Sequence, residues 1–244
     1  IVVHLYGGAC EMDKILKITK KYKLKLIEDC AQATGTKYKN RMVGTFGDIG
    51  CFSFYPTKNL GAFGDGGMII TSNKKMVDKC MALRMYGMKN NYYSKMEGYN
   101  SRLDEIQASI LNIKLKYIEN WNQKRKEIAN IYIKNIKNKY IILPKIRPDS
   151  KHVFHLFVIK TPYRKKLIEH LSKNDIGFGI HYPYPIHLQT GYSFLKKQSK
   201  YLKITEKTAK EIISLPIFPE LQNKEIEYIV KTLNSFSPSK KSNT

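Results

Sequence analysis

Residues 51–67 place a short apolar strand, a lysine and a glycine-rich turn in direct succession, as CFSFYPTKNLGAFGDGG. Lys58 is the only lysine in this stretch, and Ser53 lies five residues before it. Upstream, a second apolar strand ends in the segment Ile-Glu-Asp-Cys-Ala-Gln at residues 27–32. An acid, a small residue, a hydroxyl and a lysine therefore stand at the ends of two apolar strands. This arrangement constrains both the fold and the chemistry of the chain.

The order of the predicted elements in the first half is that of an α/β protein. An apolar stripe predicts a helix over residues 12–23, and the strand Leu24–Asp29 follows it directly. Strands over 49–55 and 68–71 and a helix over 74–86 come next. A loop over 88–100 precedes a long helix, which opens at the capping-box pattern Ser101-x-x-Asp104 and runs to about Asn135. Its expected buried face is formed by Ile106, Ile110, Ile113, Tyr117 and Trp121.

The second half predicts a smaller α/β domain. Its expected elements are a strand over 152–160, a helix over 163–174, a strand over 177–182 and a helix over 223–233. We therefore expect a large domain over residues 1–125, which includes the linking helix, and a small domain over 126–234. The remaining residues, 235–244, are rich in Ser, Lys and Pro and predict a disordered tail.

Size and cysteine usage exclude several classes of protein. With 244 residues, of which 42% are hydrophobic, the chain can bury a sizeable core in two lobes. No apolar run is long enough to span a membrane, and the first residues do not have the pattern of a signal peptide. The four cysteines lack CxxC spacing, so we expect neither a metal site nor disulfides, and a cytoplasmic location fits best.

The net charge of +23 raises the possibility of nucleic-acid binding. The lysines, however, are scattered through every segment and alternate with apolar residues, whereas a binding patch gathers its charge on one face. Specific nucleic-acid binding is therefore a minor hypothesis, and a preference for anionic small molecules is an alternative.

The residues at the strand ends match the needs of pyridoxal phosphate, which acts as an electron sink. Its aldehyde needs a lysine, its ring nitrogen a carboxylate, and its phosphate hydroxyl and amide donors. Asp29 and Ala31, two residues apart on a strand, would share one side, the acid for the ring nitrogen and the methyl group beneath the ring. Gln32 could bond the 3-hydroxyl group, Ser53 the phosphate, and Lys58 could hold the aldehyde and then move protons.

Each of these residues also has a plain structural interpretation. Asp29 could cap a turn, Ser53 could be an ordinary strand residue, and Gly64-Asp-Gly-Gly67 could be a hairpin turn. A single lysine among 43 basic residues carries no weight by itself. It is the fixed order of these residues that supports the cofactor hypothesis.

Several motifs together resemble the DegT/DnrJ/StrS aminotransferases, which are fold-type I pyridoxal phosphate enzymes that act on nucleotide-linked keto sugars. Those motifs are EDCAQA at 28–33, GDIGCFSFYPTKNLG at 47–61, GDGG at 64–67, HLYG at 4–7, GYNSRLDEIQA at 98–108, HVFHLFV at 152–158 and YPYPIH at 182–187. The similarity extends to about residue 233. It implies an aspartate aminotransferase-like fold, with part of a large domain built on a mainly parallel sheet and a small C-terminal α/β domain.

The resemblance also implies a role for each matching residue. Lys58 would be the catalytic lysine that holds the cofactor, and the cofactor-binding residues would be Asp29, Ala31, Gln32, Ser53 and Asn100. Asn100 would reach the phosphate bound by a neighbouring subunit, which implies a homodimer with a shared site. The substrate contacts would be His181, Tyr182 and His187, which could equally be polar groups at a domain seam. His152 and His155 alternate with apolar residues and are expected to be structural.

The resemblance implies transfer of an amino group from L-glutamate to a keto-deoxysugar linked to a nucleotide, with dTDP favoured and C3 as the aminated carbon. The product would serve cell-surface polysaccharide or antibiotic sugar synthesis. Some relatives carry histidine in place of the lysine and are sugar dehydratases, so Lys58 favours transamination. Because the family's phosphate-binding turn, stacking aromatic and further strands precede HLYG, we expect a truncated chain. An inactive remnant or interaction protein is the alternative function.

Overall fold

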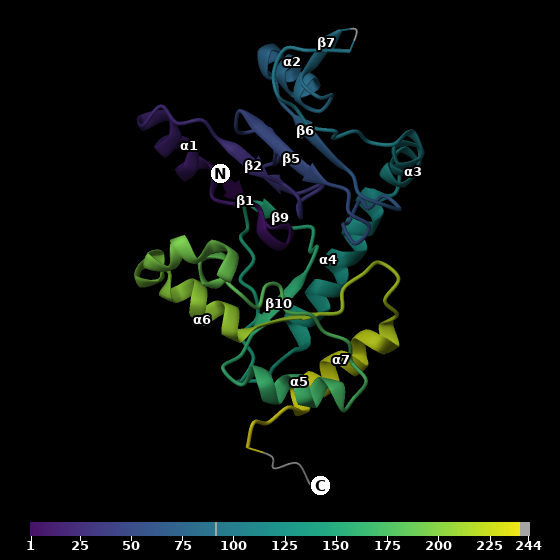
Figure 1. The fold of residues 1–244 in the computed structure, drawn as a ribbon. Coiled ribbons are helices and arrows are strands. Elements are labelled where there is room, and N and C mark those ends of the chain that lie inside the picture. Colours follow the sequence, from purple (N-terminus) through teal and green to yellow (C-terminus); the bar gives the residue numbers. More distant parts are fainter. Residues whose placement is uncertain (91, 240–244) are drawn as a thin grey trace. The chain divides into compact units, whose positions relative to one another are not determined.

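The strands predicted at 24–29 and 49–55 are neighbours in a four-stranded sheet of order β1-β2-β5-β6 (Figure 1). The computed structural model describes residues 1–90 and 92–239. The sheet consists of β1 (Val2–Val3), β2 (Ile27–Asp29), β5 (Ile49–Ser53) and β6 (Gly67–Ile70). β1, β2 and β5 run parallel, and β6 joins β5 antiparallel. The predicted mainly parallel sheet is confirmed, with β2 and β5 shorter than expected and β6 shifted by one residue.

The two faces of this sheet differ in how they are covered. Glu28 pairs with Gly50 and Val2, and their face packs against a core that includes Met12 of helix α1 (Met12–Lys21). On the opposite face, the register aligns Val3, Asp29, Cys51 and Ile69 across the four strands. Val3 and Ile69 of this row are 45% and 54% exposed. The second face, which we call the open face, therefore carries Asp29 and, two residues beyond Cys51, Ser53.

Contacts divide the chain into two compact units. The first unit contains Ile1–Gln123 and Ile146–His155; the second contains Lys124–Lys145 and the chain from Leu156 on. Residues 146–155 belong to the first unit because β9 (Ser150–Lys151) pairs with β3 (Lys37–Tyr38), which also pairs with β4 (Arg41–Met42). Of the strand predicted over 152–160, only β10 (Phe157–Lys160) forms, and it lies in the second unit. Residues 152–155 still belong to the first unit.

The helices of the first unit correct one expectation. The first two are α1 and α2 (Lys74–Leu83), close to the predicted ranges, and a short antiparallel pair, β7 (Met88–Asn90) with β8 (Tyr93–Ser94), follows. The long helix predicted from Ser101 is two helices, α3 (Glu105–Leu115) and α4 (Ile118–Asn135). Asp104 is the N-cap residue of α3 but makes no side-chain capping bond, so the predicted capping box is absent.

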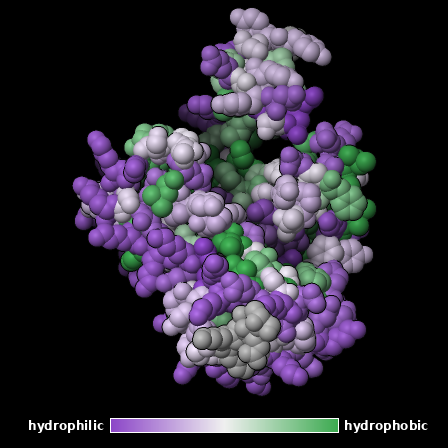
Figure 2. Space-filling model, turned by 60° about the horizontal axis from the view of Figure 1, so that its bottom comes forward, coloured by the Kyte–Doolittle hydropathy of each residue, from purple (hydrophilic) through white to green (hydrophobic). Residues whose placement is uncertain are grey.

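The apolar face predicted for the long helix is largely uncovered within the described residues. Ile106, Ile113 and Tyr117 are 68%, 60% and 52% exposed, and the break at residues 116–117 changes the phase of the stripe. Leu111 turns inward instead and packs with Phe54, Leu60 and Ala62. Hydrophobic side chains also reach the surface in several separate groups in the space-filling view of Figure 2.

The second unit has one antiparallel strand pair, β10 with β11 (Ile212–Leu215), among its described residues. Its α-helices are the C-terminal part of α4, α5 (Arg164–Ser172), α6 (Lys203–Glu211) and α7 (Asn223–Ser235). Two 3-10 helices, Ile186–Leu188 and Thr190–Tyr201, lie between α5 and α6 in the sequence. The strand predicted over 177–182 is reduced to a single bridge between Gly179 and Ser214. Of the predicted tail, Ser235 closes α7, Phe236 is buried, and residues 240–244 lie outside the described part.

No helix within the described ranges is both long enough and apolar enough to cross a membrane.

Candidate active site

Two loops that leave the C-terminal ends of parallel strands carry the predicted site residues. Asp29 is the last residue of β2, and Ala31 and Gln32 follow it in a turn. Ser53 is the last residue of β5, and Lys58 follows in the loop 54–62. This loop is closed by the Ala62 amide, which donates to the Phe54 carbonyl at 2.7 Å. Because β2 and β5 are neighbours and parallel, both loops emerge at the same edge of the sheet.

Lys58 is half-buried, and its amine makes no hydrogen bond or ion pair with the residues in the ranges 1–90 and 92–239. Burial lowers the pKa of the Lys58 amine below its ordinary value, because the charged form is poorly solvated there, and the charge of Asp29 opposes that shift. A lowered pKa gives a larger neutral fraction at a given pH than an exposed lysine has, and the neutral amine is the nucleophilic form.

Asp29 keeps one carboxylate oxygen for another partner. Its Oδ1 accepts a hydrogen bond from the Ala31 amide at 3.0 Å, and its Oδ2 accepts none from the described residues. β2 ends at Asp29, and Ala31 lies in the turn that follows it. The alternation of side chains along a strand therefore does not apply to Ala31, although the sequence predicted that Asp29 and Ala31 share one side of the strand. Asp29 itself lies on the open face, in the same row as Cys51.

Gln32 and Ser53 are the other predicted cofactor contacts on these two loops and strand ends. Gln32 is buried, and its Oε1 accepts a 2.7 Å hydrogen bond from the amide of Tyr6. The hydroxyl of Ser53 accepts a 3.3 Å bond from the Tyr55 amide. The structure thus brings Asp29, Gln32, Ser53 and Lys58 to one edge of one sheet, each on or just beyond a strand end.

The other predicted site residues belong to other segments of the chain. Asn100 is exposed, and its Oδ1 accepts from Nε of Arg102 at 3.2 Å. His181, Tyr182 and His187 belong to the second unit. Nδ1 of His181 lies 2.8 Å from the Ser214 hydroxyl, Tyr182 is 54% exposed, and Nε2 of the buried His187 lies 3.0 Å from Oε1 of Glu206. A substrate role for these residues stays a prediction.

Sequence reasoning missed the residue next to Lys58. Asn59 is buried, and its amide nitrogen donates to Asn122 Oδ1 at 2.7 Å and to the Val153 carbonyl at 3.1 Å. Its Oδ1 lies 3.1 Å from Nδ1 of His155. The only local signal is an asparagine within an otherwise apolar closing segment, which does not reveal partners 63 and 96 residues away.

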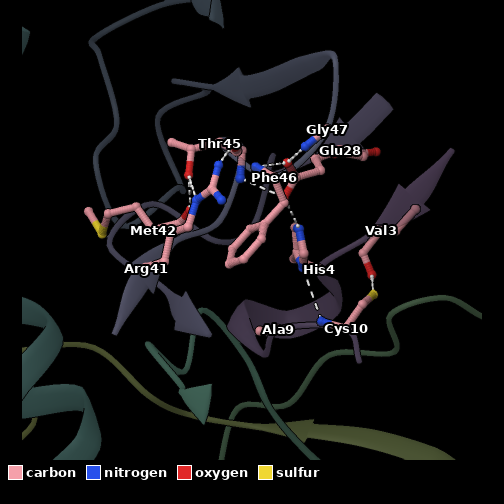
Figure 3. A network of polar contacts seen from close by, with 12 residues as sticks. Val3, His4, Ala9, Cys10, Glu28, Arg41, Met42, Thr45, Phe46 and Gly47 are labelled. Carbon is pink, nitrogen blue, oxygen red and sulfur yellow. Dashed lines mark hydrogen bonds and ion pairs between the residues drawn. The ribbon is translucent and has the colours of Figure 1, made fainter. Parts of the chain in front are cut away.

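A second buried network lies on the covered face, where Glu28 contacts His4 (Figure 3). Both side chains are fully buried, with Nε2 of His4 3.0 Å from Oε2 of Glu28. The amides of Gly44, Phe46 and Gly47 donate to the same carboxylate at 2.7, 2.7 and 2.6 Å. Burial alone would raise the pKa of Glu28, but the bonds from His4, Gly47 and Gly44 outweigh it and lower that pKa.

His4, Glu28 and Cys30 could geometrically bind a metal ion, since their ligand atoms all lie within 4.8 Å of one another. Their chemistry argues against it. Nδ1 of His4 accepts the Cys10 amide at 3.1 Å, and both Glu28 oxygens accept backbone amides. Burial raises the pKa of the Cys30 thiol, whereas a metal needs the thiolate. The network holds the loop 43–47 and the segment after β1 against β2.

Comparison with known proteins decides the family. Residues 1–234 match the model of the DegT/DnrJ/EryC1/StrS aminotransferase family. The chain belongs to this family. It is 46% identical over 236 residues to the dTDP-3-amino-3,6-dideoxy-alpha-D-galactopyranose transaminase of Aneurinibacillus thermoaerophilus, with 97% of this chain and 64% of that protein covered. It is 41% identical over 239 residues to the pleiotropic regulatory protein of Geobacillus stearothermophilus, with 97% and 64% covered.

Solved structures of the family share the fold. The crystal structure of S. venezuelae DesV, in complex with a ketimine intermediate, is 37% identical, with a TM-score of 0.91 over 95% of this chain and 63% of that chain. A family aminotransferase from Brucella abortus is 32% identical, with a TM-score of 0.87 and coverages of 95% and 62%. The predicted pyridoxal phosphate-dependent transferase fold is confirmed. The chain spans a little under two thirds of the length of these relatives.

The residues present fit the family's cofactor. A half-buried lysine with no partner among the described residues, its pKa lowered, suits an amine that must attack an aldehyde. A carboxylate whose second oxygen has no hydrogen bond from the described part of the chain suits a protonated ring nitrogen. Both groups stand at the same edge of the sheet.

Proposed function

We propose that this chain carries the lysine-bearing part of a pyridoxal phosphate-dependent nucleotide-sugar aminotransferase site. The observation that carries the proposal is that Lys58, half-buried and without a partner among the described residues, lies at the same strand-end edge as Asp29, whose Oδ2 accepts no hydrogen bond from those residues. When bound, the cofactor would supply an electron sink next to the carbon that bears the amino group. Lys58 would hold the cofactor and move the proton, and Asp29 would keep the ring nitrogen protonated.

The overall exchange would convert L-glutamate and a keto sugar into 2-oxoglutarate and an amino sugar. The relatives' names support a nucleotide-linked sugar, since they include a dTDP-amino-dideoxygalactose transaminase and a UDP-N-acetyl-3-dehydro-glucosamine aminotransferase. We favour a dTDP-linked keto-deoxysugar aminated at C3, made in the cytoplasm for a cell-surface polysaccharide or antibiotic. Gln32 and Ser53 would contact the cofactor's 3-hydroxyl and phosphate, and Ala31 would lie under the ring.

The site would be shared between two copies of the chain. Asn100, in an exposed loop, would contact the phosphate bound by a second copy, and exposed apolar side chains near it, such as Tyr99 and Ile106 at 71% and 68% exposure, support an interface there. His181, Tyr182 and His187 would approach the sugar nucleotide.

The first prediction concerns Lys58. Wild-type chain mixed with pyridoxal phosphate and then reduced with borohydride should carry the label mainly at Lys58, because its lowered pKa leaves more neutral amine than exposed lysines have. Peptide mass spectrometry locates the label. Adding L-glutamate before borohydride should remove it, since the amino group passes to the cofactor.

The matched variant Lys58→Arg keeps the charge but cannot be labelled at position 58. Only scattered labelling of surface lysines should remain. A wild-type chain with intact fold and no preference for Lys58 would contradict the proposal. It would favour the alternative that this chain is a non-catalytic member of the family.

A further inference from the structure

Asn59, Asn122 and His155 form a buried set of side-chain contacts, which we call the asparagine network. The three residues are 8%, 4% and 8% exposed. Asn59 lies in the loop 54–62, Asn122 in α4, and His155 at the end of the segment 146–155. All three belong to the first unit, so the network joins parts of that unit that are distant in sequence.

The donors and acceptors of the network require an amide at both asparagine positions. Asn59 uses its two N–H groups for Asn122 Oδ1 and the Val153 carbonyl, so its Oδ1 accepts the N–H at Nδ1 of His155. Asn122 accepts at Oδ1 and donates from Nδ2 to the Thr34 carbonyl at 3.0 Å. A carboxylate at position 59 would face two acceptors, and at position 122 one of its oxygens would face the Thr34 carbonyl.

Through Asn122 the network links the two loops that carry the proposed cofactor contacts. Thr34 lies two residues after Gln32 in the loop that follows β2, and Asn59 lies directly after Lys58 in the loop that follows β5. Gly35 makes the link possible, since its φ is +92° and a Cβ there would lie 2.5 Å from Nδ2 of Asn122. Any side chain at position 35 would therefore block the approach of Asn122 to this loop.

We propose that the asparagine network is a positioning device, which sets the place of the Lys58 amine relative to Asp29 and Gln32. The purpose of this positioning device rests on the proposed function, but the hydrogen bonds of the network do not depend on any bound group. Buried networks in which every member is paired specify one arrangement of the groups that they hold. A displacement of about 1 Å at a reacting group can cost about 100-fold in rate, so such a device has a measurable chemical effect.

The test compares Asn122→Leu with wild type, since leucine keeps the shape of asparagine and removes both links. Two measurements on Lys58 are made by peptide mass spectrometry: the pH dependence of its acetylation, which gives the pKa of the amine without any cofactor, and its labelling by pyridoxal phosphate and borohydride. We expect the pKa in the variant to rise toward the ordinary value of about 10.4 and selective labelling to fall by at least about tenfold.

Asn138→Leu is the matched control. Asn138 also donates twice, to the carbonyls of Leu233 and Phe236 at 2.8 and 2.7 Å, and accepts the Tyr140 amide, but it lies in the second unit. This variant should lower thermal stability and leave both Lys58 measurements at their wild-type values. If Asn122→Leu does not fold, Asn122→Ala removes the same two links without adding a charge or apolar bulk, and allows the same comparison.

Wild-type values of both quantities in a folded Asn122 variant would overturn the proposal and leave the network a purely stabilising role. Failure of the proposed function has a different signature, because wild-type chain would then show no preference for Lys58 toward pyridoxal phosphate. The acetylation profile would still decide whether the network places the amine.

Discussion

Glu28 and Asp29 are adjacent carboxylates on β2, and strand alternation directs them to opposite faces of the sheet. Glu28 lies on the covered face and accepts hydrogen bonds from His4 and three backbone amides. Asp29 lies on the open face, and its Oδ2 accepts no hydrogen bond within residues 1–90 and 92–239. One carboxylate thus serves the fold, and the other is left for the proposed ring nitrogen.

Replacing Glu28 with Gln should destabilise the chain by about 1–3 kcal/mol, because a neutral amide cannot accept from every group that now donates to the carboxylate. Urea unfolding followed by far-UV circular dichroism at pH 7 measures this loss. The control is Glu119→Gln, which removes a surface ion pair with Lys151 and should change stability by no more than about 0.5 kcal/mol.

The difference in unfolding free energy between wild type and Glu28→Gln should also depend on pH. Folding lowers the pKa of Glu28, so its contribution is complete above the unfolded value of about 4.3 and is lost as the pH falls through the folded value. The stability difference between wild type and Glu28→Gln should therefore narrow below about pH 4. A difference that stays constant down to the acid transition would contradict the assigned role of Glu28.

At the scale of elements, β5 depends on a residue with no side chain. Gly50 pairs with Glu28 in the register of the sheet, and the loop 43–47 passes over it to bring its amides to the carboxylate. A Cβ at Gly50 would lie 2.4 Å from the Gly44 carbonyl oxygen and 2.7 Å from its Cα. The close approach of loop and strand therefore requires glycine at this position of β5.

Gly50→Ala should cost about 1–3 kcal/mol, since the added methyl group meets backbone that cannot move without breaking the bonds to Glu28. Thermal unfolding measures the effect. Gly177→Ala is the control, because a Cβ there would have nothing within 4 Å, and its melting temperature should equal or exceed that of wild type. A Gly50→Ala variant as stable as this control would refute the packing argument.

At the scale of the whole molecule, much apolar surface is uncovered in the single chain. The open face of the sheet exposes Val3 and Ile69, and α3 exposes Ile106 and Ile113. Large contiguous apolar surfaces often mark sites of interaction with another molecule. This exposure is consistent with the proposed pairing of two chains through the region of Asn100.

A mixed dimer tests the shared site directly. Copies that carry Lys58→Ala cannot be labelled at position 58, and copies that carry Asn100→Ala should be labelled weakly at Lys58 because each site would lack the proposed phosphate contact. When the two are co-expressed with different tags, the hybrid would contain one intact site, with Lys58 from one copy and Asn100 from the other. Labelling of Lys58 in the purified hybrid should return to about half the wild-type yield per dimer, since one of its two sites is complete. Labelling no stronger than in the Asn100→Ala homodimer would place Asn100 outside the partner's site.

The sequence alone was sufficient for the family, the fold class and the order of most elements. Helix and strand periodicity is local, so α1, β2, β5, α2 and α7 lie where the pattern predicts them. The motif around Lys58 and the acid that ends β2 identify the family, because their order along the chain needs no three-dimensional information. Their roles in binding the cofactor stay predictions.

Only the tertiary structure decided which polar residues belong together and which apolar face is covered. The links from Asn59 to Asn122 and His155 span 63 and 96 residues, and that from His4 to Glu28 spans 24. Nothing in the local pattern distinguishes these side chains from other polar residues in apolar segments. The face of α3 shows the converse, since its apolar stripe predicts burial, yet Ile106 and Ile113 are exposed because the stripe does not specify which element packs against it. Periodicity reports which side of an element is apolar, whereas packing and hydrogen-bond partners come from segments brought together only by folding.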